Sequence, residues 1–316
     1  MPQEPVGEKR QGRRGQKGTD LYNAGHRLSQ AGRKIGKDPQ SIREGDTPGG
    51  QVVSTQKFLD IEGLSLDLGG VRILEDISFS LEKGRYLGII GPNGAGKSSL
   101  LKCIGRLHKN FTGRVSLEGV SLSSMSERAL ARRIAWVHQT GSDSLPFTVR
   151  EFALMSRYPW QKAIGGETVE DRSIIDRSLE TADVADIADR QLNSLSGGER
   201  QKALIAAALA QSTDILFLDE PTSFLDYRHQ VETLELIERV NREQGMTVLL
   251  VTHDINLALH GADEVLAIKK GRMVWKGESS ELLEEGLLPE IFDTGFKSFT
   301  SEGQIMPYVA PGGLVR

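Results

Sequence analysis

The spacing of hydrophobic residues divides the chain into two parts. Residues 1–55 sustain neither an alternating nor a helical spacing, and they contain no Phe or Trp. From Phe58 onward, short β-branched or alternating runs at 58–66, 77–81 and 86–90 predict strands separated by glycine-containing turns. A chain without apolar clusters cannot offset the entropy lost on ordering. We therefore expect residues 1–55 to be disordered, with the folded region beginning at about residue 56.

Helices and short apolar strands alternate after Gly91. The runs with helical spacing are 97–104, 149–158, 200–210 and 227–240. The runs that predict strands are 134–138, 215–218, 247–251, 265–268 and 273–275. This alternation indicates an α/β fold with a mostly parallel sheet covered by helices on both faces. A small helical insert, at about residues 140–200, is expected between two halves of the sheet.

Composition excludes several classes of protein. Among 316 residues, 38% are hydrophobic and 26% are charged, which is typical of a globular chain. The longest nearly continuous apolar stretch, 203–210, is too short to span a membrane, and the first twenty residues lack the apolar block of a secretory signal. We therefore expect a cytosolic chain. The single Cys103 excludes an intramolecular disulfide and any multi-cysteine metal site.

Charge is distributed unevenly along the chain. Residues 1–51 carry ten Lys or Arg against six Asp or Glu, a net charge of +4 in a chain whose total is −4. Such a basic segment is either a solvated extension or an arm that contacts anionic lipid or nucleic acid, and solvated extensions are the more common of the two. We expect no nucleic acid partner.

The most informative motif lies between a predicted strand and a predicted helix. The pattern G-x-x-x-x-G-K-[ST] is matched by Gly91, Pro92, Asn93, Gly94, Ala95, Gly96, Lys97 and Ser98. Glycines let the backbone wrap a polyphosphate, and the N–H groups at the helix start attract anions. Lys97 can then neutralise β- and γ-phosphate oxygens, and Ser98 can hold Mg²⁺. The sequence therefore predicts a nucleotide site.

Two adjacent carboxylates, Asp219 and Glu220, follow the apolar run 215–218. The carboxyl ends of parallel strands border the crevice where ligands bind. Asp219 can hold Mg²⁺ through water, and Glu220 can polarise an attacking water, as hydrolysis of a phosphoanhydride requires. His253 stands in a similar place after the run 247–251.

A second potential anion site precedes the helix at 200–210. Ser196, Gly197 and Gly198 stand where a helix cap would lie, within Leu195–Gln201. Two such helix starts in one chain, with 98 residues between Lys97 and Ser196, require an explanation.

Taken together, these motifs resemble those of the ATP-binding subunits of ABC transporters, over residues 58–292. The resemblance implies an α/β P-loop NTPase fold of the ABC ATPase type, with an antiparallel β subdomain and a helical signature subdomain. The ABC ATP-binding domain would then occupy residues 56–293, followed by a C-terminal extension at 294–316. The position 23 residues before Gly91 usually carries an aromatic side chain that stacks on adenine, and Leu68 occupies it here.

The resemblance also implies a role for each motif. Residues 91–99, which include Ser99, correspond to Walker A, and Leu195–Gln201 correspond to the ABC signature. The residues that it assigns to catalysis are Glu220, Gln139 and His253, and the residues that it assigns to Mg²⁺ are Ser98, Asp219 and Gln139. Residues 223–226 resemble the D-loop, with Phe224 where a small residue is common.

In this family two subunits pair head to tail, so that each ATP lies between Walker A of one subunit and Ser196–Gly198 of the other. The implied cofactors are ATP and Mg²⁺. The implied partners are a second copy of the chain, a polytopic membrane permease and, indirectly, a substrate-binding protein, at the cytoplasmic face of the cell membrane.

Three functions stay open at this point. The first is the ATPase of a membrane importer, because residues 148–151, 156–159 and 222–230 are similar to those of the ATPases that serve ferric siderophore, haem and cobalamin uptake. The second is a soluble ABC ATPase of the iron–sulfur assembly type, and the third is the ATPase of an exporter.

Overall fold

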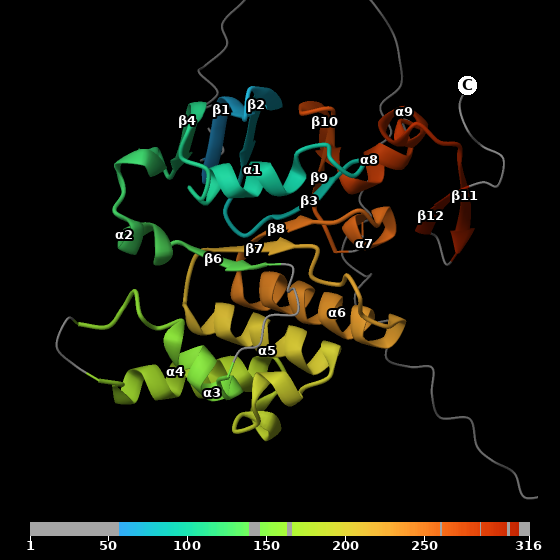
Figure 1. Ribbon diagram of the computed structural model, residues 1–316. Helices are drawn as coiled ribbons and strands as arrows, with labels where there is room; N and C mark the ends of the chain where they lie inside the picture. The colour runs from blue at the N-terminus through green and yellow to red at the C-terminus, as the bar shows by residue number, and fades with distance from the viewer. Residues whose placement is uncertain are drawn as a thin grey trace, which may run out of the picture. The chain divides into compact units, whose positions relative to one another are not determined.

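The computed structural model describes residues 57–138, 146–162, 166–259, 261–284, 286–301 and 304–309. The chain divides into two units between residues 53 and 54, and the described residues belong to the second (Figure 1). The predicted disorder of residues 1–55 and the predicted role of Gln139 both fall outside the described residues. The boundaries expected at 56 and 293 stay predictions.

A six-stranded sheet forms the centre of the second unit. Its order is β10-β9-β3-β8-β7-β6. The strands are β3 (Tyr86–Ile90), β6 (Ile134–Val137), β7 (Ile215–Asp219), β8 (Thr247–Val251), β9 (Glu264–Lys269) and β10 (Arg272–Glu278). All neighbours are parallel except β10, which runs antiparallel to β9. Every residue of β3, β7 and β8 is buried, as expected for parallel strands covered on both faces. The predicted α/β fold is confirmed.

A second sheet is antiparallel, in the order β2-β1-β4-β5. Its strands are β1 (Leu59–Leu68), β2 (Val71–Leu81), β4 (Phe111–Leu117) and β5 (Val120–Ser121). Gly69 and Gly70, at φ 57° and 80°, make the two-residue turn between β1 and β2, which requires positive φ at both positions. The sequence predicts a strand only at 77–81, whereas β2 begins at Val71. A register shift next to Asp76, at φ 51°, interrupts the alternation of apolar and polar residues on which the prediction depends.

Helices lie on both sides of the six-stranded sheet. Figure 1 shows α1 between the two sheets, with α5 and α6 on the opposite face and α3 and α4 packed beyond α5. The helices are α1 (Lys97–Ile104), α2 (Glu127–Ala131), α3 (Val149–Met155), α4 (Val169–Thr181), α5 (Gly197–Ala210), α6 (Tyr227–Gln244), α7 (Ile255–Leu259), α8 (Ser279–Glu284) and α9 (Leu288–Phe292). A final hairpin pairs β11 (Phe296–Ser301) with β12 (Gln304–Val309). Among the helices of the described ranges, none combines the length and the hydropathy needed to cross a bilayer.

Helices α3 and α4 lie in the region where the sequence predicts a helical insert, and both pack on α5. This helix is buried from Ala203 to Ala210, and its many alanines allow α3, α4 and α6 to approach closely. Helix α4 has no counterpart among the predicted helices, because its surface is mostly polar and its start depends on a cap. Thr168 and Asp171 form that cap through reciprocal hydrogen bonds. The packing fixes the N-terminus of α5, which carries the predicted signature.

Candidate active site

The phosphate-binding loop predicted from sequence connects β3 to α1, and its shape depends on glycine. At Gly91, with φ 146°, an added Cβ would lie 2.0 Å from the Ile268 carbonyl oxygen. At Gly96, with φ 104°, it would lie 2.7 Å from Leu74 Cδ2. Any other residue would therefore displace the loop from both the sheet and β2.

Lys97 lies inside the curve of this loop and is 7% exposed. Its Nζ donates to the carbonyl oxygens of Gly91 (2.8 Å) and Pro92 (3.2 Å). Burial lowers the pKa of the Lys97 ammonium, and the negative charges of Glu220 and Asp219 offset part of this effect. The ammonium is thus held by the loop itself, where it can meet the oxygens of a bound phosphate.

Ser98 and Asp219 meet across 121 positions of sequence. Ser98 Oγ donates to Asp219 Oδ1 at 2.7 Å, and Asp219 is 7% exposed at the end of β7. In the described ranges no group of three or more His, Cys, Asp or Glu side chains could hold a metal ion. One hydroxyl and one carboxylate nevertheless fit Mg²⁺, which usually takes one or two protein oxygens together with water and phosphate. Gln139, the third ligand expected, lies outside the described residues.

Glu220 and His253 form a second pair of functional groups. Glu220 Oε2 lies 2.7 Å from His253 Nδ1 and accepts a hydrogen bond from Ser223 Oγ at 3.1 Å. The backbone N–H of Glu220 donates to the Val251 carbonyl (2.9 Å), which joins the turn after β7 to the end of β8. Two contacts on one carboxylate oxygen fix its direction and leave Oε1 available to a reactant.

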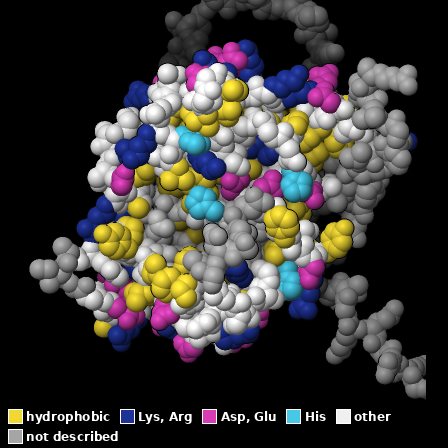
Figure 2. Space-filling view, viewed as in Figure 1, with side chains coloured by type: hydrophobic (Ala, Val, Ile, Leu, Met, Phe, Trp, Pro, Cys, Tyr) yellow, Lys and Arg dark blue, Asp and Glu magenta, His cyan; other side chains and the backbone are white. Residues whose placement is uncertain are grey.

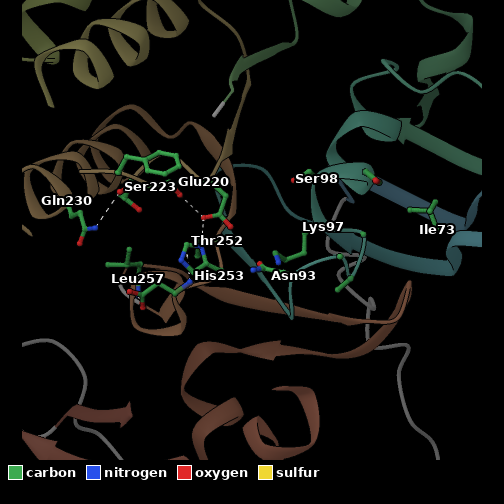
Figure 3. Close-up of a pocket in the computed structure, with 17 residues that line it drawn as sticks. Ile73, Asn93, Lys97, Ser98, Glu220, Ser223, Gln230, Thr252, His253 and Leu257 are labelled. Atoms are coloured by element: carbon green, nitrogen blue, oxygen red, sulfur yellow. Dashed lines mark hydrogen bonds and ion pairs between the residues drawn. The ribbon is translucent and has the colours of Figure 1, made fainter. Parts of the chain in front are cut away.

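Lys97, Ser98, Glu220 and His253 border one cavity of about 740 Å³, whereas Asp219 is not among its lining residues. Figure 3 shows Glu220 and His253 close together, with Lys97 and Asn93 on the facing side. The lining residues are Ile73, residues 93–99, Glu220, Thr222, Ser223, Phe224, Gln230, Thr252, His253, Asp254 and Leu257. On the face seen in Figure 2, basic, acidic and histidine side chains lie close together across the middle. The cavity therefore brings together three segments that are far apart in sequence.

Leu68, the residue expected to lie next to adenine, does not line this cavity. Leu68 is 38% exposed and is not among the lining residues, whereas Ile73 is. The Ile73 carbonyl oxygen lies 3.1 Å from where a Cβ at Gly96 would stand, so this part of β2 directly adjoins the phosphate loop. The position of Ile73 could have been inferred only from the hairpin that joins β1 to β2.

The signature residues lie outside this cavity. Ser196 caps α5, with its Oγ accepting from Glu199 N (3.3 Å) and its own N–H donating to Glu199 Oε2 (2.8 Å). The hydrogen bonds from the Ser196 backbone and side chain lower the pKa of Glu199. Gly197 is exposed beside this cap. Within one chain the two predicted anion sites are therefore separate.

Thr252, Asp254 and Leu257 line the cavity without a role in the sequence predictions, whereas Ser223 lies in the predicted D-loop and Thr222 and Gln230 lie in the run 222–230. Gln230 Nε2 donates to the carbonyls of Leu225 (3.2 Å) and Thr222 (3.4 Å) and so stabilises the turn after Glu220.

Comparison with known proteins gives a consistent picture. A family model described as ABC transporter matches residues 74–223. The iron(3+)-hydroxamate import ATP-binding protein FhuC of Bacillus subtilis is 40% identical over 234 residues, 74% of this chain and 87% of that protein. The petrobactin import ATP-binding protein YclP of Bacillus subtilis is 36% identical over 247 residues, 78% of this chain and 97% of that protein.

Solved structures agree with this relationship. A chain of a metal-chelate type ABC transporter in an inward-facing conformation superposes with a TM-score of 0.69 at 27% identity, covering 80% of this chain and 97% of that one. A dimeric ATP-binding cassette in a post-hydrolysis state, bound to ADP and Pi, gives a TM-score of 0.61 at 28% identity, covering 70% and 98%. The chain belongs to the ABC transporter family and is one of its ATP-binding, ATP-hydrolysing subunits.

Proposed function

We propose that this chain hydrolyses ATP, as a head-to-tail dimer, to energise a membrane importer of a metal chelate such as a ferric siderophore, haem or cobalamin. The observation that carries the catalytic part is the arrangement of Glu220, His253 and Ser223 across the cavity from Lys97. The import assignment is supported by relatives whose names state import of iron hydroxamate and petrobactin.

Each part of the cavity has a distinct task in this proposal. The loop at 91–99 wraps the phosphates, and Lys97 neutralises their oxygens. Ser98 and Asp219 would hold Mg²⁺, with Gln139 as a third ligand, and the bound ion would neutralise phosphate charge. Glu220 orients the attacking water and accepts its proton.

His253 orients the Glu220 carboxylate by donating from Nδ1, and a ring that carries a proton on both nitrogens can also donate from Nε2 to the γ-phosphate. In this form the ring links the two reacting groups, since one nitrogen faces the base and the other faces the phosphate. The contact of His253 with Glu220 supports this assignment.

The second copy supplies the signature. Because Ser196–Gly198 lie outside the cavity of their own chain, we propose that they complete the ATP site of the partner subunit. The backbone N–H groups at the start of α5 suit an anion there. The dimeric cassette among the solved relatives supports this assembly.

The permease is proposed to contact the segment that follows α3, at the cytoplasmic face of the membrane, with a substrate-binding protein delivering the cargo. Tyr158 is 75% and Trp160 38% exposed. Figure 2 shows hydrophobic side chains exposed on the side of the molecule where α3 and α4 lie. Arg157, in the same segment, is buried at 4% exposure and so is not part of this exposed surface.

The test compares Glu220→Gln with Lys97→Ala. Glu220→Gln should abolish hydrolysis while ATP still binds and the dimer accumulates, whereas Lys97→Ala should weaken ATP binding itself. Hydrolysis is measured by phosphate release and the dimer by size-exclusion chromatography with ATP. Near wild-type hydrolysis by Glu220→Gln would remove Glu220 from the assigned role.

Import is tested separately, by purification from native membranes and uptake into proteoliposomes. Recovery of a polytopic permease, and uptake of a ferric siderophore, haem or cobalamin only with hydrolysable ATP, is expected. Recovery with soluble assembly factors alone, or outward pumping, would support the iron–sulfur assembly or exporter alternative instead.

A further inference from the structure

His229, in the first turn of α6, packs directly on the signature residue Gly198. A Cβ added to Gly198 would lie 2.0 Å from His229 Cδ2 and 2.3 Å from Cγ. Gly198 lies within α5 and has no positive φ, so its backbone conformation alone would accept any residue. Within this chain, the imidazole ring therefore restricts the position to glycine.

Asp226 holds the imidazole ring of His229 in place. Asp226 Oδ1 accepts from His229 N (2.9 Å) and lies 2.8 Å from His229 Nδ1, so one carboxylate caps α6 and fixes the imidazole. The His229 side chain is 29% exposed. Leu225 approaches the neighbouring signature residue, with its Cδ2 3.5 Å from where a Cβ at Gly197 would stand. Leu225, just before α6, and His229, in its first turn, thus lie against the two signature glycines.

A second contact joins α5 to α6 one turn later. Lys202 Nζ lies 2.7 Å from Glu232 Oε2, and Arg228 Nε lies 2.9 Å from Glu232 Oε1. These hydrogen bonds lower the pKa of Glu232 to about 2. Two contacts therefore join the N-terminal halves of α5 and α6: the packing of His229 on Gly198 and the ion pair of Lys202 with Glu232.

The same segment reaches the catalytic carboxylate at its other end. Ser223 donates to Glu220 through Oγ (3.1 Å), and its backbone N–H donates to the Glu220 carbonyl (3.2 Å). Glu220 and Phe224 both have positive φ, 54° and 68°. A short, conformationally constrained turn thus separates the base that acts on one ATP from the residues that hold His229.

We propose that His229 is a positioning residue that links the turn 220–226 to the signature at 196–198 of the same chain. The inference rests on the proposed dimer, in which Glu220 serves the ATP bound by its own chain and Gly198 serves the ATP bound by the partner. A change in the turn at one site then shifts the signature at the other. Such a link is a coupling free energy between the two ATP sites.

The kinetic test uses the full chain with His229→Ala. Alanine keeps the backbone N–H that donates to Asp226 but lacks the ring that packs on Gly198. We expect cooperative hydrolysis in the wild type, with a Hill coefficient above 1, and a Hill coefficient of about 1 in the variant. The ATP concentration at half-maximal rate should rise about fivefold or more, with the rate at saturating ATP changed by less than about twofold. Glu235→Ala, an exposed position farther along α6, is the matched control and should match the wild type.

The contact itself is tested by thermal unfolding without nucleotide. Gly198→Ala should lower Tm by roughly 2–12 °C, because the methyl group overlaps the His229 ring. The double variant Gly198→Ala/His229→Ala should lose less than the sum of the two single losses, since the methyl group then occupies space that the ring has vacated. Additive losses would overturn the assigned contact.

The outcomes separate this inference from the proposed function. Cooperative hydrolysis that persists in His229→Ala, or a non-cooperative wild type, overturns the inference and leaves the ATPase assignment standing. A fall in Tm and maximal rate at an unchanged Hill coefficient shows a structural role only and also overturns it. Absence of any hydrolysis by the wild type overturns both.

Discussion

The buried ion pair of the helical insert, Arg157 with Asp171, makes the substitution Asp171→Asn a sharp test of how α4 is held. Arg157 Nε lies 2.8 Å from Asp171 Oδ1, and the two side chains are 5% and 6% exposed. Arg157 Nη1 also donates to the Ala210 carbonyl (2.8 Å) and to Ser212 Oγ (3.0 Å), at the C-terminal end of α5. In the variant the guanidinium keeps these neutral acceptors and loses the counter-ion that Asp171 supplies.

The expected loss follows from the burial. Removing one partner of a buried pair costs about 3–5 kcal/mol, because the remaining charge is left uncompensated. Asparagine can still accept a hydrogen bond from the Thr168 N–H, which donates to Asp171 Oδ2 at 3.1 Å, so the lower end of about 3 kcal/mol is expected. For a domain of this size that corresponds to a fall in Tm of roughly 6–12 °C.

The pH dependence of this loss has a definite sign. Burial alone would raise the pKa of Asp171, but the hydrogen bonds from Arg157 and Thr168 outweigh it and the pKa is lowered. A carboxyl whose pKa is lower when folded contributes stability above its unfolded pKa of about 3.9, and that stability is lost as the pH falls through the folded pKa. The difference between wild type and variant should therefore be constant from about pH 5 to 8 and shrink below about pH 4.

The assay is denaturant unfolding of the full chain at pH 7 and at about pH 3. Asp176→Asn is the matched control, because Asp176 lies on the same helix in an exposed pair with Arg150, at 2.7 Å and 51% and 42% exposure. Exposed pairs contribute at most about 1 kcal/mol. Equal losses in Asp171→Asn and Asp176→Asn would refute the reasoning that burial makes the first pair costly to break.

Three further predictions follow from other sites. Ile73→Ala should raise KM for ATP about fivefold, or about 1 kcal/mol, whereas Leu68→Ala should leave KM unchanged. The kcat/KM values for ATP and GTP should differ by less than about tenfold, because neither Ile73 nor Leu68 can form hydrogen bonds with a nucleotide base. Burial lowers the pKa of His138 despite the nearby charge of Asp219, so wild-type stability should rise with pH up to about 6.5, and His138→Gln should flatten that rise in denaturant titrations. Deletion of residues 1–51 should leave Tm and the basal ATPase rate nearly unchanged, and a loss of several degrees would show that the segment docks on the folded region.

The central sheet could be predicted from sequence because each chemical motif stands between a short apolar strand and a helix. The loop at 91–98 is an example. The sequence pattern requires glycine at Gly91 and Gly96, and the structure shows that a side chain at either position would collide with neighbouring atoms. Asp219 likewise follows an unbroken apolar run, which a buried parallel strand requires. Where local spacing and tertiary structure agree, the sequence is sufficient.

Other features depend on partners distant in sequence and could not be predicted. Helix α4 has few apolar positions and is positioned by the pair of Arg157 with Asp171. The packing of His229 on Gly198 joins two motifs that were interpreted separately, because no local pattern indicates that a ring from one helix covers a glycine of the other. The position of Ile73 could not be predicted for the same reason, since it depends on the hairpin of β1 with β2 and on contact with the phosphate loop.

The two adjacent carboxylates illustrate how one backbone change separates two chemical tasks. Asp219 is the last residue of β7, paired in register with Val251, and its side chain contacts Ser98, where we propose that Mg²⁺ binds. Glu220 follows at φ 54°, a left-handed conformation that costs a non-glycine residue about 1 kcal/mol, and its carboxylate turns toward His253. A glycine would adopt that conformation without the cost but would supply no base. The strain at Glu220 is therefore better explained by the chemistry of its side chain than by any requirement of the fold.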